Sequence, residues 1–428
     1  MCKPELLKDK RFAVEVEGCR TNQYEGEAIA AAFESCGAVQ CSEAPDIAII
    51  VGCTITAAAD RKCRKMIRHT RRSNPNAVII VCGCYAQNMT EAECATLGAD
   101  IAVGNRMKEK LPQMAEQFLK ERKTICAVNE NILHDSHWDA LSLDRPRLHT
   151  RAFLKIQDGC SQYCSYCIVP SVRGLPVSRA LDEAVNEAKR ITEAGCAEIV
   201  LTGIHIGLYE NLPLLVEKIS ALPKIRRLRF GSIEPLAVSD RLLGVLADSP
   251  VFCCHLHIPL QSGDTSVLSD MKRGYSARDF ARITENARAR LGDTLHISTD
   301  LMVGFPTEDK ISFEKSLKFV KECSFGKVHV FPYSPRKGTE AAKLSQIPQQ
   351  EMNERSSEAL TLAAALHEKF CSRWIGRECE MLTEENKNGT IKGLTRNYIR
   401  ITAHGTSEVG EDAFIIPVSY KNEGLSAP

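Results

Sequence analysis

Three closely spaced cysteines are the residues of this sequence best suited to bind a metal centre. Cys160, Cys164 and Cys167 have the spacing C-x3-C-x2-C and follow a strand expected over Ala152–Ile156, which puts them on a loop at a strand end. Three such thiolates can bind one iron–sulfur cube, which has four irons and normally takes four cysteine ligands. The spacing therefore predicts a [4Fe-4S] cluster with one iron left open to bind a small molecule.

Two other interpretations of this loop fit less well. A zinc site normally uses paired C-x2-C units, or cysteine and histidine together with a fourth ligand. The neighbouring histidines are His149, which precedes the strand, and His205, which lies far beyond the loop. A disulfide framework would leave one of the three cysteines over. The cluster is therefore the favoured interpretation.

A second set of three cysteines is spread over the first hundred residues. Cys19, Cys53 and Cys84 each directly follow a glycine, which permits a sharp turn. Each also follows an expected strand, over residues 12–17, 46–51 and 77–81. Because the carboxyl ends of parallel strands share one edge of a sheet, where ligands bind, these thiols should meet there and hold a second open cluster. Cys63, on a helix, and Cys82, inside a strand, are not expected to be ligands.

Amphipathic helices separate these strands. We expect them over residues 22–35, 57–72 and 90–97. Asn22 is placed to cap the first of them, with Glu25 three residues later, in the pattern of a capping box. Alternating apolar strands and amphipathic helices predict a parallel sheet covered by helices on both faces.

The second of these helices is strongly basic. Residues 61–72 contain seven lysines and arginines and no acidic residue. Such a run is often only a solvated face. Beside a ligand-binding edge it can also hold a phosphate backbone. The sequence leaves both interpretations open.

Composition limits the class of protein. The 428 residues are 44% hydrophobic and 25% charged, which is typical of a globular chain with two or three domains. The net charge of +1 provides no global attraction for nucleic acid, so any such affinity must come from local patches. No apolar run reaches membrane-spanning length and no signal segment is evident, so we expect a cytoplasmic location. There the 19 cysteines would stay reduced.

The pattern of elements predicts an α/β protein with three parts. Residues 1–137 should form the parallel α/β sheet domain, and residues 138–150 a linker. About six β–α units follow within residues 151–370, too few to close an eight-fold barrel. Short strands dominate residues 371–428 and predict a small all-β barrel.

Several motifs resemble the radical S-adenosylmethionine (SAM) enzymes, and within them the methylthiotransferase family. The loop from Cys160 to Cys167 resembles the former. The runs GCRTNQYE at 18–25, CTIT at 53–56 and GCYAQ at 83–87 resemble the three cysteine motifs of the latter. One departure is Val51-Gly52, where the family usually has Asn-Thr before the second cysteine. It affects the surroundings of the cluster and not the number of its ligands.

This resemblance implies a partial (β/α)6 barrel that binds SAM at its strand ends. Tyr166 resembles the aromatic residue that packs on the adenine, and Gly203 belongs to a glycine turn near the amino group. Glu234 and Gln261 lie in the similar runs SIEP and HIPLQSG, at strand ends where polar groups face a ligand. Two arginines after the cluster loop are either holders of a carboxylate or phosphate or solvated loop residues: Arg173 and Arg179.

The run GLTRNYIR at 393–400 resembles the nucleic-acid-binding TRAM module that ends this family. Composition gives no support, because seven basic side chains stand against eight acidic ones from Cys371 on. Only a one-sided arrangement of the basic residues would support RNA contact: Arg373, Arg377, Lys392, Arg396 and Arg400.

The resemblance implies two [4Fe-4S] clusters and SAM as cofactors, with no catalytic residue beyond the cluster ligands. The implied reaction inserts a methylthio group at C2 of N6-threonylcarbamoyladenosine at position 37 of tRNA, beside the anticodon. A flavodoxin or ferredoxin would supply electrons, and the sequence does not identify the sulfur donor. Alternative substrates are N6-isopentenyladenosine in tRNA and an aspartate of a ribosomal protein. A two-cluster electron carrier is the alternative outside enzymology, although a carrier needs neither open irons nor a barrel.

Overall fold

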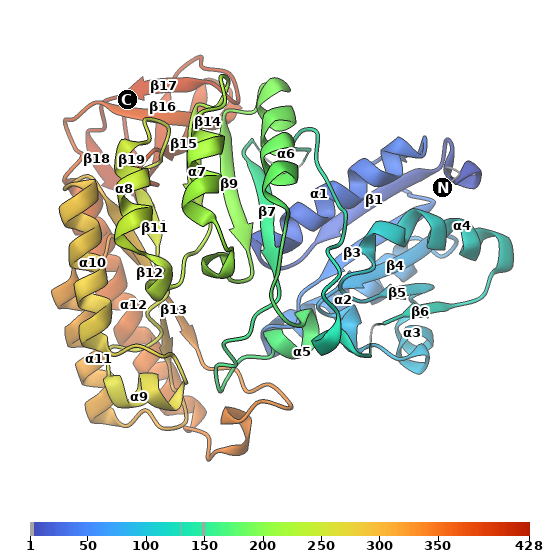
Figure 1. Cartoon of the computed structure of the whole chain (residues 1–428), viewed down its shortest axis with the longest axis horizontal. Coiled ribbons are helices and arrows are strands. Elements are labelled where there is room, and N and C mark those ends of the chain that lie inside the picture. The colour runs from blue at the N-terminus through green and yellow to red at the C-terminus, as the bar shows by residue number, and fades with distance from the viewer. Residues whose placement is uncertain (1–3, 129, 148–149) are drawn as a thin grey trace.

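The computed structural model describes residues 4–128, 130–147 and 150–428. Figure 1 shows three parts: an amino-terminal sheet with its helices, a central curved sheet with helices on its outer side, and a carboxyl-terminal all-β part. The predicted α/β fold class is confirmed. Within the described residues, no helix combines the length and the apolar character needed to cross a bilayer.

The amino-terminal sheet is entirely parallel, with the strand order β2-β1-β3-β4-β5-β6. Its strands are β1 (Arg11–Val16), β2 (Val39–Gln40), β3 (Ile47–Gly52), β4 (Val78–Gly83), β5 (Ile101–Val103) and β6 (Ile125–Ala127). Its helices are α1 (Arg20–Ser35), α2 (Ala57–Ser73), α3 (Glu91–Leu97) and α4 (Leu111–Glu121). Successive residues of β3 and β4 enter two different cores, one with α1 and α4 and the other with α2 and α3. This explains why both strands are apolar throughout.

The first helix begins earlier than predicted. Cys19, and not Asn22, is the N-cap of α1, and it provides no side-chain capping bond. Asn22 is buried in the first turn, where its amide donates to Glu17 O over 2.8 Å. Asn22 thus fixes the turn that carries Cys19, and its predicted role as a cap is wrong.

Six parallel strands form the central half barrel in sequence order. The pairings are β10-β9-β7 and β11-β12-β13, and a parallel bridge from Leu228 to Phe252 joins the two groups. Its strands are β7 (Ala152–Asp158), β9 (Glu198–Gly203), β10 (Arg227–Phe230), β11 (His255–His257), β12 (His296–Val303) and β13 (Lys327–Pro332), with the short antiparallel β8 (Val177–Ser178) beside β7. The helices are α5 (Val169–Arg173), α6 (Leu181–Glu193), α7 (Leu212–Ser220), α8 (Asp240–Asp248), α9 (Thr265–Asp270), α10 (Ala277–Leu291) and α11 (Lys310–Cys323). The predicted partial barrel is confirmed.

A long helix, α12 (Gln349–Ser372), packs on β13 and leads into the last sheet. This sheet has the strand order β17-β14-β15-β16-β19-β18 and is antiparallel except between β16 and β19. Its strands are β14 (Cys379–Lys387), β15 (Thr390–Thr395), β16 (Arg400–His404), β17 (Asp412–Ile415), β18 (Ser419–Lys421) and β19 (Gly424–Ser426). The all-β prediction is confirmed, and the strands pair in one open order from β17 to β18.

Buried charges attach this last sheet to the half barrel. Arg229 of β10 donates to Glu198 Oε1 of β9 over 2.7 Å and to the backbone oxygens of Thr395 and Arg396. Arg229 and Glu198 are both fully buried, and Arg151 reaches Glu198 only at 3.6 Å. Because a charge stranded in the interior is costly, this contact holds the two parts in one arrangement.

We predict that Arg229→Met lowers the free energy of unfolding by about 3–5 kcal/mol, because Glu198 then stays buried without its main partner. Urea denaturation measures this loss. Adding Glu198→Gln should restore a large part of it, since no charge is then stranded. Arg282→Met, at an exposed arginine paired with Asp279, should cost about 1 kcal/mol or less. Equal losses for both arginines would contradict the role of the buried pair.

Candidate metal centres

The structure brings together the three widely spaced cysteines of the amino-terminal domain. Cys19, Cys53 and Cys84 follow β1, β3 and β4, which are neighbours in the sheet. Gly18 has a φ of 123°, and a Cβ there would lie 2.7 Å from Cys53 Cβ, so only glycine lets the first loop approach the second this closely. The pKa of the Cys53 thiol is raised to about 12, mainly by burial and further by the neighbouring thiols of Cys84 and Cys19. The three thiols thus share one edge of the sheet.

The two cysteines excluded on sequence grounds have other surroundings. The Cys63 thiol is buried on α2 and donates to Cys53 O over 3.4 Å. Cys82 lies inside β4 and packs in the apolar core shared with α1. Cys63 therefore supports the loop of Cys53, and Cys82 belongs to the core.

The second set of cysteines lies on the loop between β7 and α5. Backbone N–H groups point to two of the sulfurs, from Gln162 to Cys160 and from Val169 to Cys167, each over 3.4 Å. The third, Cys164, accepts from Arg273 Nη1, also over 3.4 Å. Hydrogen bonds of this kind stabilise iron-bound thiolates, so the donor set fits a three-cysteine cluster.

The first two loops of the amino-terminal set contact the half barrel at the carboxyl ends of its strands. Arg20, which follows Cys19, donates to Gly231 O beyond β10 over 2.5 Å. Thr54, which follows Cys53, accepts from Arg336 beyond β13 over 2.9 Å. These contacts hold the edge with the three thiols over the carboxyl edge of the barrel, where barrel enzymes bind their ligands.

The third loop contacts the segment that follows the cluster loop of the barrel. Arg173 Nε donates to Cys84 Sγ over 2.9 Å, and Asn105, on the loop after the neighbouring strand β5, donates to Val172 O over 2.6 Å. Arg173 lies six residues after Cys167, at the end of α5. One guanidinium therefore connects a cysteine of one set to the loop that carries the other set.

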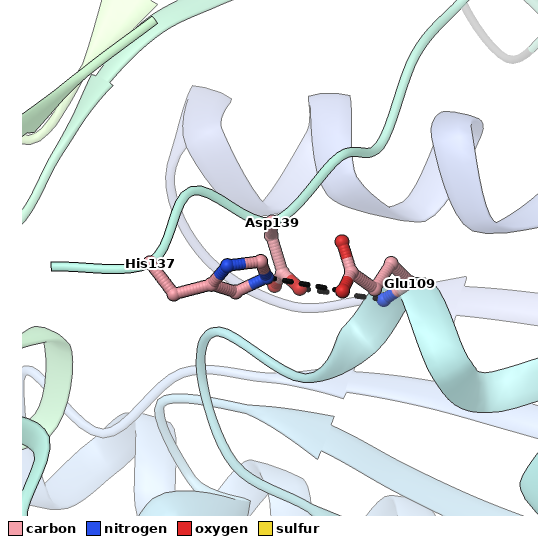
Figure 2. Close-up of side chains that lie close together, drawn as sticks. All are labelled: Glu109, His137 and Asp139. Atoms are coloured by element: carbon pink, nitrogen blue, oxygen red, sulfur yellow. Dashed lines mark hydrogen bonds and ion pairs between the residues drawn. The ribbon is translucent and has the colours of Figure 1, made fainter. Parts of the chain in front are cut away.

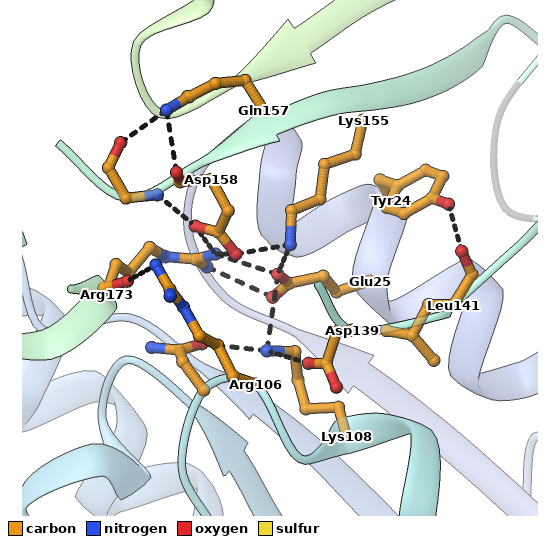
Figure 3. Close-up of polar contacts among 12 residues, drawn as sticks. Tyr24, Glu25, Arg106, Lys108, Asp139, Leu141, Lys155, Gln157, Asp158 and Arg173 are labelled. Atoms are coloured by element: carbon orange, nitrogen blue, oxygen red, sulfur yellow. Dashed lines mark hydrogen bonds and ion pairs between the residues drawn. The ribbon is translucent and has the colours of Figure 1, made fainter. Parts of the chain in front are cut away.

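Arg173 belongs to a buried group of charges between the two domains, which we call the interdomain network (Figure 3). Its members are Glu25, Arg106, Lys108, Asp139, Lys155, Asp158 and Arg173. Glu25 of α1 accepts from Lys155 over 2.7 Å and from Arg173 over 2.9 Å. Burial alone would raise the pKa of Glu25, but Arg173, Lys108 and Lys155 hold it well below its usual value. The network therefore stays ionised although it is fully buried.

Asp158 connects the network directly to the cluster loop of the barrel. Its carboxylate pairs with Lys155 over 2.6 Å and accepts from the backbone of Gly159, the residue before Cys160. Burial opposes its ionisation, but Lys155 and Arg173 hold the pKa of Asp158 far below its usual value. Asp158 and Arg173 thus fix the two ends of the cluster loop.

The sequence prediction did not identify the network. Lys155 interrupts the strand expected over Ala152–Ile156, and Asp158 follows that range; in the structure both lie in the buried strand β7, where a charged side chain requires a partner. That signal was available, but it does not name the partner. Glu25 was assigned to the cap of α1, and it pairs across the domain interface instead.

The structure also places the two arginines proposed to hold a ligand's carboxylate or phosphate. All N–H groups of Arg173 point to protein atoms, namely those of Asn22, Glu25, Cys84 and Asp158. Arg179 is buried and donates to Glu187 and Tyr24. These contacts differ from the prediction. Both guanidinium groups join parts of the protein, and Arg173 has no free donor for a ligand.

The other residues assigned to SAM lie near the carboxyl edge of the barrel. Gly203 ends β9, and Glu234 pairs with Arg273, the residue that also contacts Cys164. Tyr166 packs edge-on against Phe305. Arg273 was missed because nothing in the sequence connects it with the distant cluster loop.

Gln261 provides an observation that fits a bound polar molecule. Its backbone has a φ of 72° and its N–H donates to Asp300 O over 2.9 Å. Its side-chain oxygen, Oε1, is buried without a hydrogen-bond partner. An acceptor of this kind at a ligand-binding edge suits an ammonium group such as that of SAM.

Glu109, His137 and Asp139 place their ligand atoms within 4.8 Å of one another, in an arrangement that could hold a metal ion (Figure 2). His137 Nε2 lies 3.0 Å from Glu109 Oε1, and the other oxygen of Glu109 accepts from Ala140 N over 2.7 Å. Lys108 Nζ lies 3.0 Å from Asp139 Oδ2, so a cation there would face an ammonium group. These contacts attach the segment after His137 to the amino-terminal domain.

A half barrel with a three-cysteine loop after its first strand defines the class of radical SAM enzymes. Residues 154–320 match the family model of the radical SAM superfamily, and residues 11–104 match the uncharacterized protein family UPF0004. A solved structure of the radical SAM methyltransferase TsrM from Kitasatospora setae, with cobalamin and a [4Fe-4S] cluster bound, has a similar fold. Its TM-score is 0.60 at 14% identity, and the match covers 78% of this chain and 77% of that one.

Curated relatives narrow the class further. The chain is 36% identical to threonylcarbamoyladenosine tRNA methylthiotransferase MtaB of Bacillus subtilis, over 92% of this chain and 90% of the relative. It is 31% identical to tRNA-2-methylthio-N(6)-dimethylallyladenosine synthase of Caldicellulosiruptor saccharolyticus, over 91% and 86%. The chain belongs to the radical-SAM methylthiotransferase family, whose members use SAM and [4Fe-4S] clusters.

We predict that Arg173→Met lowers the reduction potential of the cluster held by Cys19, Cys53 and Cys84. The reduced cluster is the more negative form, and it would lose a hydrogen bond and a positive charge at Cys84. The measurement is a redox titration followed by electron paramagnetic resonance. It uses a background with alanine at Cys160, Cys164 and Cys167, so that a single cluster is observed.

Arg106→Met is the matched control for this titration. Arg106 is also buried and donates to Arg173 O over 3.0 Å, but it does not contact Cys84. It should leave the potential unchanged, and Arg173→Lys should give an intermediate value. If Arg173→Met and Arg106→Met lowered the reduction potential equally, the effect of Arg173 would come from the loss of a buried charge in general and not from its contact with Cys84.

Proposed function

We propose that this protein inserts a methylthio group at C2 of N6-threonylcarbamoyladenosine in tRNA. The observation that carries the proposal is the position of the three amino-terminal cysteine loops, each of which contacts the half barrel or its cluster loop. Two three-cysteine sites joined in this way suit a reaction that needs a radical and an activated sulfur at one opening. An electron carrier needs neither the barrel nor the second site.

The chemistry explains why this chain needs no acid–base residue at the site. The hydrogen on an aromatic adenine carbon is not acidic, so a carboxylate or imidazole could not remove it. When bound, SAM and the clusters supply carbon-radical chemistry and a place for the sulfur. Cys160, Cys164 and Cys167 would hold the cluster that binds SAM. Cys19, Cys53 and Cys84 would hold the other, with Arg173 donating to Cys84.

Four residues are the candidates for holding SAM: Tyr166, Gly203, Glu234 and Gln261. Gln261 offers a buried acceptor, and Glu234 is oriented by Arg273. A Cβ at Gly203 would lie 2.8 Å from Gln157 O, so glycine lets the end of β9 pack closely against β7. These contacts support a binding edge formed before the ligand arrives.

A reductant must reach the cluster of the barrel. A pocket of about 200 Å³ lies over the cluster loop and is lined in part by Tyr163, Cys164, Cys167 and Lys337. Tyr163 is half exposed, and aromatic side chains are enriched where proteins contact one another. We assign this face to an electron donor of the flavodoxin or ferredoxin type. With a tRNA substrate, the enzyme would work in the cytoplasm.

The alternative substrate is N6-isopentenyladenosine, which the dimethylallyladenosine synthase relatives suggest. The run NQYE at 22–25 and the 36% identity to the Bacillus subtilis relative favour the threonylcarbamoyl nucleoside. Both substrates would use the same clusters, so only the identity of the tRNA nucleoside separates them.

Deletion of the gene should remove 2-methylthio-N6-threonylcarbamoyladenosine from total tRNA and leave its unmethylthiolated precursor. Mass spectrometry of tRNA nucleosides measures both. Complementation with the wild-type gene should restore the product, whereas a gene encoding Cys53→Ala should not. If the deletion strain instead keeps the methylthiolated threonylcarbamoyl nucleoside and loses the methylthiolated isopentenyl nucleoside, the substrate is N6-isopentenyladenosine and the proposal is wrong.

A further inference from the structure

The outer surface of α2 carries a line of cations, which we call the basic stripe: Arg61, Lys65, Arg68 and Arg72. They occupy positions i, i+4, i+7 and i+11. At 3.6 residues per turn they lie within about 60° of one another around the helix axis, and they extend over about 16 Å along it. Cys63, Ile67 and Thr70 are the buried residues of α2 and lie on its opposite side. The stripe therefore points away from the sheet.

The basic stripe has no partner within the described part of the chain. All four side chains are exposed, and none forms an ion pair or side-chain hydrogen bond there. Other charges of the helix are occupied: Lys62 pairs with Glu17, Arg71 with Asp100, and Asp60 with Arg336. Arg64 hydrogen-bonds Tyr85.

This arrangement costs helix stability. Like charges spaced i, i+4 destabilise a helix by about 0.2–0.5 kcal/mol per pair. Arg61 also lies near the amino terminus of α2, where the helix dipole disfavours a cation. An unrelieved row of this kind is stabilised when an anion binds along it.

The stripe begins beside a contact between the amino-terminal domain and the half barrel. The backbone N–H of Ala57, the first residue of α2, donates to Ser334 Oγ beyond β13 over 3.1 Å. Cys63, two residues after Arg61, contacts the backbone of Cys53. A polyanion bound along α2 would therefore run from the neighbourhood of Cys53 outward over the amino-terminal domain.

We propose that the basic stripe binds the sugar–phosphate backbone of the substrate RNA and so guides the target nucleotide toward Cys53. This inference rests on the proposed function, since it takes RNA to be the substrate. The stripe is linear and contains only charged side chains. That suits a phosphate backbone better than a protein partner, whose interface would need an apolar centre.

The carboxyl-terminal sheet offers fewer free cations for this task. Of the five basic residues expected to contact RNA, Arg396 pairs with Glu380, Lys392 with Glu385, and Arg373 donates to Asp293 O. Among the described residues, only Arg377 and Arg400 of that set have no side-chain partner. Within the described residues, the last sheet therefore lacks the one-sided group of unpaired basic residues that would support RNA binding. Among these same residues, helix α2 presents four unpaired cations in a row.

The test compares two full-length variants with four changes each. One replaces the stripe (Arg61→Gln, Lys65→Gln, Arg68→Gln and Arg72→Gln). The control removes the same charge from exposed positions of α10 and α11 on the far side of the half barrel (Arg278→Gln, Arg282→Gln, Lys318→Gln and Lys321→Gln) (Figure 1). Equilibrium binding of each is measured against salt concentration. The probes are an anticodon stem-loop RNA with N6-threonylcarbamoyladenosine and the same RNA with plain adenosine.

Loss of the stripe should weaken binding of both RNAs on the order of 100-fold near 0.1 M salt, and should reduce the slope of log affinity against log salt by about three. The preference between the two RNAs should not change. The control should behave like wild type. Lysine at Arg61, Arg68 and Arg72 should preserve binding. Thermal melting should show the stripe variant to be at least as stable as wild type, because like-charge repulsion is removed.

Wild-type affinity and slope in the stripe variant would overturn the proposal. If that variant instead bound RNA normally but was no longer reduced by flavodoxin, the stripe would be a site for an acidic protein, and the proposal would again be wrong. The substrate assignment fails separately, if wild-type protein binds both RNAs but yields no methylthiolated nucleoside. That result would leave the binding difference between the variants intact.

Discussion

A buried charged side chain needs a partner of opposite charge, and in this protein the partners lie on different domains. Glu25 comes from the amino-terminal domain, whereas Lys155, Asp158 and Arg173 come from the half barrel. Removing one member of a buried ionic group costs about 3–5 kcal/mol, so the domains cannot separate or slide without a large penalty. The network therefore fixes their relative position more firmly than apolar contact alone, which tolerates repacking.

This constraint acts where the cysteines are. Glu25 lies on α1, whose N-cap is Cys19, and Asp158 and Arg173 flank the loop from Cys160 to Cys167. Arg173 also reaches Cys84 directly. The group that joins the domains thus also orients both sets of metal ligands. A reaction that requires a radical and a sulfur atom to meet on one carbon needs this kind of fixed geometry, because small misplacements of reacting groups reduce rates strongly.

The remaining parts surround this centre. The last sheet is attached by Arg227 and Arg229 of β10, so it is carried by the same half barrel. Arg20 donates to Gly231 O and to Tyr398 of the last sheet, and it directly follows Cys19. All three parts of the chain therefore meet close to one cysteine. In such an arrangement, a substrate held by outer surfaces can be presented to a rigid site.

The sequence was sufficient for whatever depends on local pattern. The alternation of strands and helices set the positions of β1, β3 and β4, and the glycine before each cysteine marked the strand ends. Pairings across the domain interface have no such signal. Glu25 and Arg173 are 148 residues apart in the chain, and each looked like a local feature, one a cap residue and the other a loop cation. The orphaned Oε1 of Gln261 likewise becomes visible only when its surroundings are known.

The most direct test of this account is the iron and sulfide content of protein purified without oxygen. Wild-type protein should hold about eight irons per chain, and alanine at Cys19, Cys53 and Cys84 together should reduce this to about four, since each cube has four irons. Cys63→Ala, which removes the thiol in contact with Cys53 O, should keep about eight irons. If the triple variant retained the full wild-type iron content, or if wild-type protein never exceeded about four irons, the account of two three-cysteine centres would be wrong.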